Sequence, residues 1–196
     1  MMSRGTQQRG HYKQWWAGLL AIVPFYQPSN DRTGVVVYYQ NGVRECIADC
    51  SCRHVLTQLA QYLGTSLPQM QARAAAEGYQ RKGPLVFHGR LCLVPIKFRE
   101  QKRKNNGTLG YVNVQAVARI FQNDDGSSVL YFQDNSISLI ALQRKATVQR
   151  HVQQGLSLLA GYGEQVAPEQ MQAVGAVYPW EQGFGQTVKH GVMDGQ

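Results

Sequence analysis

The chain has 196 residues, of which 43% are hydrophobic and 16% are charged, and its formal net charge is +8. This length allows one good hydrophobic core or two small ones, and four cysteines are too few for a secreted disulfide scaffold of this size. Residues 81–150 carry 12 Lys or Arg against 4 Asp or Glu, whereas residues 1–80 carry 7 against 4 and residues 151–196 carry 1 against 4. We therefore expect a cationic binding face in the middle of the chain and a separate acidic end.

The N-terminal region predicts a basic leader and then a buried strand. Three cations precede an apolar run that Pro24 closes, which imitates a signal peptide. No small-x-small cleavage site follows, and the run is too short to span a bilayer. We expect a flexible leader over residues 1–13, a strand over Trp15–Tyr26, no membrane segment and a cytoplasmic location. Secretion is the less favoured alternative.

A hairpin is predicted next. Val35–Tyr39 is β-branched and aromatic, and Asn41 and Gly42 form the pair that type I′ turns prefer. Val43–Ala48 should return antiparallel to the first strand.

Two helices should follow the hairpin. Ser51 is a suitable N-cap for an apolar stripe with helical spacing, and Gly64 should end that helix. A second, Ala-rich helix should open at Ser66 and end near Gly78. Its weak apolar face indicates that it lies over the core rather than inside it.

From Leu85 onward, short strands alternate with turn signals about every ten residues, which is typical of an antiparallel sheet or half-barrel. The predicted strands are Leu85–His88, Leu91–Phe98, Tyr111–Val114, Arg119–Gln122, Val129–Phe132 and Ile137–Leu142, with a short helical turn around Gln115–Val117. Gln143–Gln154 then has helical spacing, and Gly155 either ends that helix or lies within it.

These elements predict an α+β protein that is mainly antiparallel β. We expect two β-sheet or hairpin units, a helical insertion and a C-terminal helix. Residues 14–160 should form a single β-rich unit, with an N-terminal sheet and helices over 14–80 and a β-meander and helix over 81–160. Residues 161–196, rich in Gly, Gln and Pro, should be a flexible acidic tail.

The segment 97–108 is the strongest functional signal, because it places five cations and one carboxylate in twelve residues between two predicted strands. Strands can present such a loop to a polyanion in one geometry, and nucleic-acid phosphates are what this charge density neutralises best. A solvated hairpin tip that only prevents edge aggregation is the alternative. Two further cations stand where the last strand meets the helix. The predicted DNA-binding residues are Lys97, Arg99, Lys102, Arg103, Lys104, Asn105, Asn106, Thr108, Arg144 and Lys145.

The chemistry of these side chains fits a narrow A·T minor groove. The enhanced negative potential of that groove attracts inserted cations, so loop cations such as Lys102 and Arg103 are suited to enter it or to grip flanking phosphates. Asn105 and Asn106 offer donors and acceptors to base edges, and Thr108 adds a hydroxyl. Lys97 and Arg99 alternate along the chain, so on a strand they would share a face.

Four collinear segments resemble the competence transcription factor ComK family. Ile47–Arg53 resembles the family's strand ending in Ser-Cys-Arg, and Lys82–Val86 with Leu91–Pro95 resembles its Lys-Pro-Pro-Ile run and the strand ending in Phe-Pro. Gly110–Val114 resembles its Gly-Trp-Ile segment, and Val129–Ala141 its strand, turn and strand before the last helix. The block 110–145 also resembles LytTR-type DNA-binding domains.

The resemblance implies a transcriptional activator of competence that binds AT-rich boxes in double-stranded DNA, largely through the minor groove. It further implies a homodimer or higher oligomer on DNA, contact with RNA polymerase, a nucleoid-associated location and a protease adaptor acting through the tail, which is similar to the family only at Val177–Pro179.

Other functions are less favoured. An RNA-binding or ribosome-associated protein would use the same basic surface, although few aromatics in the middle segment are expected to be exposed for base stacking. A protein-interaction module with an acidic partner is a third class. No catalytic motif appears, so we expect no enzyme and no cofactor. Cys46, Cys50, Cys52 and His54 lack the usual zinc spacing, so buried structural thiols are preferred to a metal or redox site, and Cys92 should lie in the core.

Overall fold

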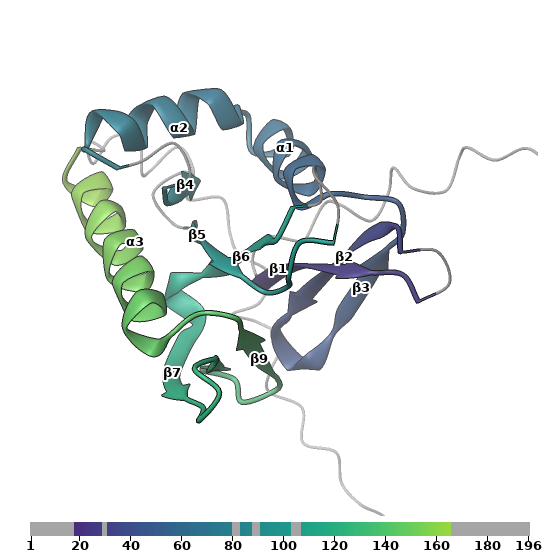
Figure 1. Ribbon diagram of the computed structural model, residues 1–196. Coiled ribbons are helices and arrows are strands. Elements are labelled where there is room, and N and C mark those ends of the chain that lie inside the picture. The colour runs from purple at the N-terminus through teal and green to yellow at the C-terminus, as the bar shows by residue number, and fades with distance from the viewer. Residues whose placement is uncertain (1–17, 29–30, 80–82, 88–90, 103–106, 166–196) are drawn as a thin grey trace, which may run out of the picture. The chain divides into compact units, whose positions relative to one another are not determined.

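A computed structural model describes residues 18–28, 31–79, 83–87, 91–102 and 107–165 (Figure 1). In chain order the elements are β1 (Leu19–Tyr26), β2 (Thr33–Tyr39), the 3-10 turn η2 (Gln40–Gly42), β3 (Arg44–Ile47), α1 (Cys52–Tyr62), α2 (Leu67–Ala76), β4 (Leu85–Phe87), β5 (Leu91–Lys97), β6 (Leu109–Asn113), the 3-10 turn η3 (Val114–Ala116), β7 (Val117–Gln122), β8 (Ser128–Phe132), β9 (Ser138–Ala141) and α3 (Lys145–Gln165). The predicted leader and nearly all of the predicted tail lie outside the described residues.

Two antiparallel sheets carry the fold. The larger sheet has six strands in the order β3-β2-β1-β6-β5-β4, and the smaller has three in the order β7-β8-β9. Helices α1 and α2 are inserted between β3 and β4, and α3 follows the last strand. The predicted α+β class, with its helical insertion and C-terminal helix, is confirmed.

The grouping of the strands differs from the expected division near residue 81. Strand β6 pairs with β1 through Ala21–Val112 and Ile22–Tyr111, so β4, β5 and β6 complete the N-terminal sheet. Only β7, β8 and β9 form a separate meander. The pairing joins residues about 90 positions apart, which local sequence patterns do not specify.

The hairpin turn between β2 and β3 follows its local chemistry. The loop has three residues, Gln40–Gly42, rather than the two of the expected type I′ turn, and it uses the left-handed conformations of Asn41 (φ +63°) and Gly42 (φ +72°). The amide of Tyr39 donates to the carbonyl of Val43 across the turn (2.8 Å). The predicted hairpin is confirmed.

Both predicted helix starts are also confirmed. Ser51 Oγ accepts from the amide of His54 (3.2 Å) and caps α1, and Ser66 Oγ accepts from the amide of Gln69 (3.4 Å) and caps α2. These bonds satisfy amides that have no partner within the helix.

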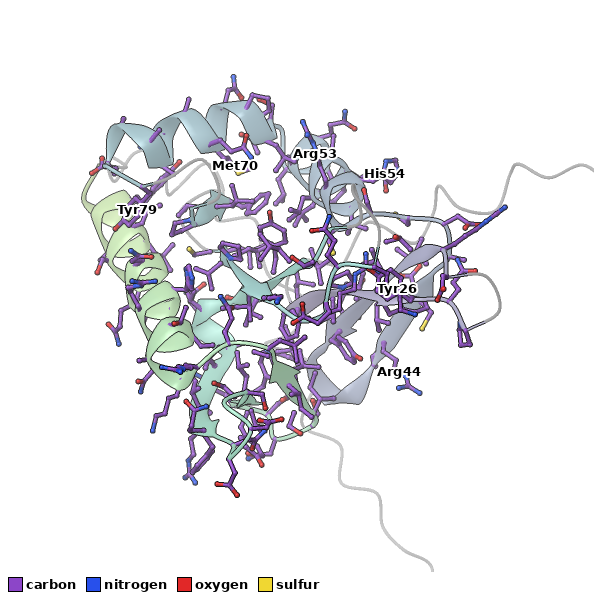
Figure 2. All side chains as sticks on the ribbon, viewed as in Figure 1. Tyr26, Arg44, Arg53, His54, Met70 and Tyr79 are labelled. Carbon is purple, nitrogen blue, oxygen red and sulfur yellow. The ribbon has the colours of Figure 1, made fainter. Side chains whose placement is uncertain are left out.

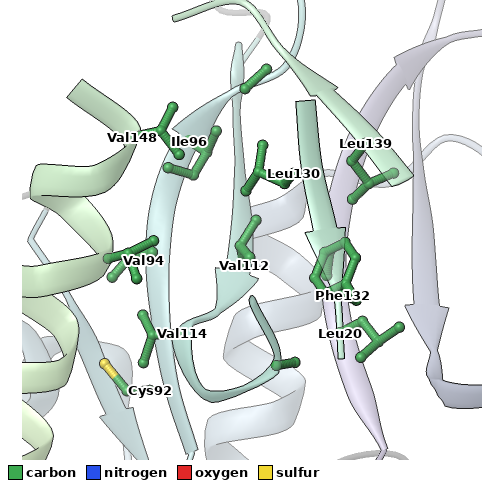
Figure 3. Close-up of a cluster of buried hydrophobic side chains, with 14 of the residues drawn as sticks. Leu20, Cys92, Val94, Ile96, Val112, Val114, Leu130, Phe132, Leu139 and Val148 are labelled. Carbon is green, nitrogen blue, oxygen red and sulfur yellow. The ribbon is translucent and has the colours of Figure 1, made fainter. Parts of the chain in front are cut away.

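Each face of the six-stranded sheet buries its own core. Alternate residues of β5 divide between them: Leu91 and Leu93 pack toward α1 and α2, whereas Cys92, Val94 and Ile96 pack toward the three-stranded sheet and α3. Figure 3 shows the second core, where Val148 of α3 lies beside Ile96 and where Leu130, Phe132 and Leu139 come from the smaller sheet. The smaller sheet therefore has one buried face and one outer face.

Helix α3 continues through Gly155, so this glycine lies within the helix. A Cβ atom there would be 2.6 Å from Val114 Cγ1 and 2.7 Å from Val94 Cγ1. Only glycine allows α3 to lie this close to η3 and β5, which explains a residue that lowers helix propensity by about 1 kcal/mol.

None of the helices in the described ranges is both long enough and apolar enough to cross a lipid bilayer.

Candidate nucleic-acid interface

The basic loop leaves the sheet at the end of β5 and returns at the start of β6. Strand β5 ends at Lys97, and the amide of Phe98 donates to the carbonyl of Thr108 (3.0 Å), which closes the base of the loop. Thr108 is half-buried beside this bond. Four predicted site residues at the tip, Arg103, Lys104, Asn105 and Asn106, lie outside the described residues.

Arg99 is buried inside the base of the loop and is only 7% exposed. Its Nε donates to the carbonyl of Gly107 (2.8 Å), one terminal nitrogen donates to the carbonyl of Phe25, and the other donates to Thr33 Oγ1 (3.3 Å). It lies beyond the end of β5, so it does not alternate with Lys97 on that strand. Burial lowers the pKa of this guanidinium, although arginine stays protonated in proteins. In this arrangement Arg99 fixes the loop against the β1–β2 connection.

Tyr26, at the end of β1, is the second anchor of the loop (Figure 2). Its hydroxyl donates to the carbonyl of Glu100 (3.0 Å) and accepts from the amide of Lys102 (2.9 Å). The ring lies 4.0 Å from the guanidinium carbon of Arg99 and 5.0 Å from the ammonium of Lys102. Tyr26 therefore contacts both the backbone and two cations of the described part of the loop.

The two described loop lysines are ion-paired near the surface. Lys97 Nζ lies 2.7 Å from a carboxylate oxygen of Glu100, and Lys102 Nζ lies 2.8 Å from a carboxylate oxygen of Asp31. Exposed pairs of this kind contribute roughly 0–1 kcal/mol, so a phosphate can replace the carboxylate at little cost. These two ion pairs fix the positions of both ammonium groups.

The loop meets the start of α3 through Lys97. The amide of Lys97 donates to Gln143 Oε1 (2.9 Å), and its carbonyl accepts from the amide of Leu142 (2.7 Å). Arg144 follows at once, and its carbonyl accepts the first helical bonds from Thr147 and Val148. The predicted site residues Lys97 and Arg144 are thus brought into one neighbourhood, although 46 residues separate Lys97 from Gln143.

Lys145 joins the same neighbourhood from the other side. Its amide donates to Gln122 Oε1 at the end of β7 (2.7 Å). Arg144 is exposed and Lys145 is half-buried, and neither forms an ion pair with a carboxylate of the described residues. The positive end of the α3 dipole adds to their charge. We call Lys97, Lys102, Arg144 and Lys145 the basic surface.

The outer face of the smaller sheet carries side chains that the sequence analysis did not single out. Arg119 pairs with Tyr131, and Phe121 pairs with Val129, which pairs in turn with Ile140. Phe121 and Tyr131 are 50% and 39% exposed, contrary to the expectation that few aromatics of this segment face solvent. The run Ile137–Leu142 is apolar at every position except Ser138, so its sequence does not separate the two faces, and the strand pairing shows which residues face outward.

The four cysteines differ in their burial. Cys52 and Cys92 are buried, as expected, and burial raises the pKa of each thiol to about 12. Cys46 is exposed on the edge strand β3, so the expectation that it is buried was wrong. Cys46 shares one face of β3 with the exposed Arg44, whereas Ile47 packs against a core on the other face, so the exposure of Cys46 depends on which face of the sheet is covered. Among the described residues, no group of three or more His, Cys, Asp or Glu side chains is placed to hold a metal ion.

The site combines a braced loop that carries Lys97 and Lys102, the start of α3 with Arg144 and Lys145, and the exposed outer face of the smaller sheet. Cations arranged in this way are suited to binding an anion. No protein-family model, no curated protein and no solved structure matches this chain.

Proposed function

We propose that this protein binds double-stranded, AT-rich DNA through the basic surface and regulates transcription. The observation that carries the proposal is the double hydrogen bond of the Lys97 backbone to Leu142 and Gln143, which places the basic loop beside the start of α3. Two cationic segments distant in sequence thereby act on one stretch of phosphates.

Rigid presentation of the loop supports the proposal. A cation held in place loses less conformational entropy on binding than a free one, so the buried guanidinium of Arg99 favours affinity without contacting the ligand. The backbone amide of Lys102 donates to the Tyr26 hydroxyl, so the backbone that carries this cation is also held in place. Insertion of the loop tip, residues 103–106, into a narrow A·T minor groove would add readout of groove width.

The resemblance to competence activators extends the proposal to activation of transcription by a dimer or higher oligomer in contact with RNA polymerase in the nucleoid. Adaptor-dependent proteolysis through the tail belongs to the same extension.

Salt titration of duplex binding, followed by fluorescence anisotropy, tests the proposal. If six cations meet phosphates, the slope of log K against log salt is about −5. Lys97→Ala should reduce the slope by about 1. Arg53→Ala is the matched control, because Arg53 is exposed on α1, across the larger sheet from α3. A slope near zero would remove the electrostatic basis of the proposal.

Two further experiments separate loop from helix and DNA from RNA. Neutralising Lys102, Arg103 and Lys104 together should weaken binding to all duplexes alike, and normal binding would mean that the loop is only a solubilising tip. Arg144→Ala or Asn106→Ala should instead reduce discrimination between sequences. Competition between an AT-rich duplex and single-stranded RNA should favour the duplex, and the reverse preference would support an RNA-binding protein.

A further inference from the structure

The outer face of the smaller sheet is apolar where an antiparallel sheet normally shows polar side chains to water. Of the seven large hydrophobic side chains exposed among the described residues, four lie on this face or at its edge: Phe121, Tyr131, Ile140 and Leu142. Ile140 is 58% exposed. Grouped apolar exposure of this kind marks a binding surface. We call Arg119, Phe121, Val129, Tyr131 and Ile140 the open face.

The open face holds two aromatic rings and a cation side by side. The ring centres of Phe121 and Tyr131 are 5.5 Å apart with the planes at 86°, so the two rings are not stacked on each other. Arg119 lies directly across the strand pair from Tyr131. An unpaired nucleobase can stack on an aromatic ring while a nearby guanidinium neutralises the phosphate of the same nucleotide.

Both edges of the smaller sheet are hydrogen-bonded to segments that carry cations of the basic surface. On the β9 side, the amide of Leu142 donates to the carbonyl of Lys97, and on the β7 side, the amide of Lys145 donates to Gln122 Oε1. A strand whose phosphates bind near Lys97 and Lys145 is therefore held close to the sheet that carries the open face.

The acidic groups nearby restrict the path of such a strand. Asp124 and Asp125 lie in the turn between β7 and β8, and the Asp125 carboxylate accepts from the amide (2.9 Å) and the hydroxyl (2.6 Å) of Ser127. Phosphates would avoid this turn and follow the side of β9 and α3, where Lys97 and Arg144 lie.

We propose that the open face binds the unpaired bases of a DNA strand next to the duplex held by the basic surface. The proposal rests on the proposed function, because the neighbouring duplex supplies the strand. A second copy of this chain is the weaker occupant, since face-to-face packing would bring two Arg119 side chains out of water against a surface without a carboxylate partner.

Fluorescence anisotropy with labelled oligo(dT) tests this assignment. Phe121→Ala and Tyr131→Ala should each weaken oligo(dT) binding roughly tenfold, because a stacking surface is removed. Binding of fully paired duplex should not change. Tyr131→Phe keeps the ring and should bind as wild type does, which separates stacking from misfolding. Tyr62→Ala is the matched control, since Tyr62 is 45% exposed on α1.

Three outcomes would overturn the assignment. These are unchanged oligo(dT) binding in both alanine variants, at least tenfold tighter binding of an RNA oligonucleotide of the same length, and a change from dimer to monomer in light scattering when Phe121 is replaced. A different result would show that the proposed function is wrong and the assignment of the open face is right. In that case oligo(dT) binding would still depend on Phe121 and Tyr131, but the wild-type protein would show no salt-dependent affinity for duplex.

Discussion

The guanidinium carbon of Arg99 lies 4.0 Å from the centre of the Tyr26 ring, at the place where the basic loop packs against the end of β1. Both residues also bind backbone of the loop: Arg99 donates to the carbonyl of Gly107, and the Tyr26 hydroxyl donates to the carbonyl of Glu100. One cation of a strongly basic segment is thus a structural part of the loop rather than a surface charge.

Replacing Arg99 should therefore affect stability first and DNA binding second. Arg99→Met keeps the length of the side chain but leaves the carbonyls of Phe25 and Gly107 without their donor. We expect a loss of about 2–4 kcal/mol in the free energy of unfolding, measured by urea titration. Arg53→Met, at an exposed position of α1, should change this free energy by less than about 0.5 kcal/mol. Equal effects of the two changes would contradict the bracing role of Arg99.

Tyr26→Phe should loosen the loop without unfolding the protein. The change removes only the hydroxyl, which donates to Glu100 and accepts from the amide of Lys102. A cost of about 1 kcal/mol is expected. Hydrogen exchange should show the Lys102 amide exchanging faster while the amides of β5 keep their protection. Unchanged exchange at Lys102 would mean that this hydrogen bond does not persist in solution.

Gly155 and Gly161, which both lie inside α3, should respond in opposite ways to alanine. Gly155→Ala places a methyl group within 2.7 Å of Val114 and Val94 side-chain atoms, and overpacking of about 1–3 kcal/mol should exceed the gain in helix propensity. Nothing lies within 4 Å of a Cβ built at Gly161. Gly161→Ala should therefore stabilise by roughly 0.5–1 kcal/mol. Thermal unfolding of both variants measures the difference, and stabilisation by Gly155→Ala would contradict the close packing of α3.

The buried thiols should make the protein less stable in alkali. Burial raises the pKa of Cys92 to about 12, whereas an exposed thiol has a pKa near 9.0. Between these values the unfolded thiol is ionised and the folded thiol is neutral, so stability falls as pH rises from about 9 toward 12. The loss approaches about 1.4 kcal/mol per pH unit for each such thiol. Urea unfolding at pH 8 and pH 10 should show a smaller fall for Cys92→Ala than for wild type.

The exposed Cys46 should react differently from the two buried thiols. In wild type at pH 8, a thiol reagent should modify Cys46 quickly and Cys52 and Cys92 only at the rate of unfolding. Rapid modification of all four thiols would contradict the burial of Cys52 and Cys92.

Local features of this fold were predictable because the interactions that form them span only a few residues. Asn41 and Gly42 set the hairpin turn through their own left-handed conformations, and Ser51 and Ser66 cap helices by bonds to amides three positions ahead. The high density of Lys and Arg in the segment 97–108 also predicted a candidate binding site without any knowledge of the fold.

The site was less predictable than the elements that hold it. Lys97 and Arg144 were predicted as site residues from the sequence, and the fold brings their backbones together. Arg99 was predicted with them, although it is buried. A list of charges does not tell which cation finds carbonyl acceptors inside the fold. Phe121 and Tyr131 were missed for a related reason, since apolar strand residues are buried or exposed according to which face the sheet covers.

The sequence by itself determined the turns, the helix caps, most strand positions and the concentration of positive charge, because hydrogen bonds and conformational preferences within a few residues decide these. Only the tertiary structure decided that β6 pairs with β1, that Lys97 meets the start of α3, and that one face of the β7–β9 sheet stays open. Those outcomes depend on which distant apolar surfaces bury each other with the greatest gain in free energy, and that gain belongs to the whole core rather than to any segment.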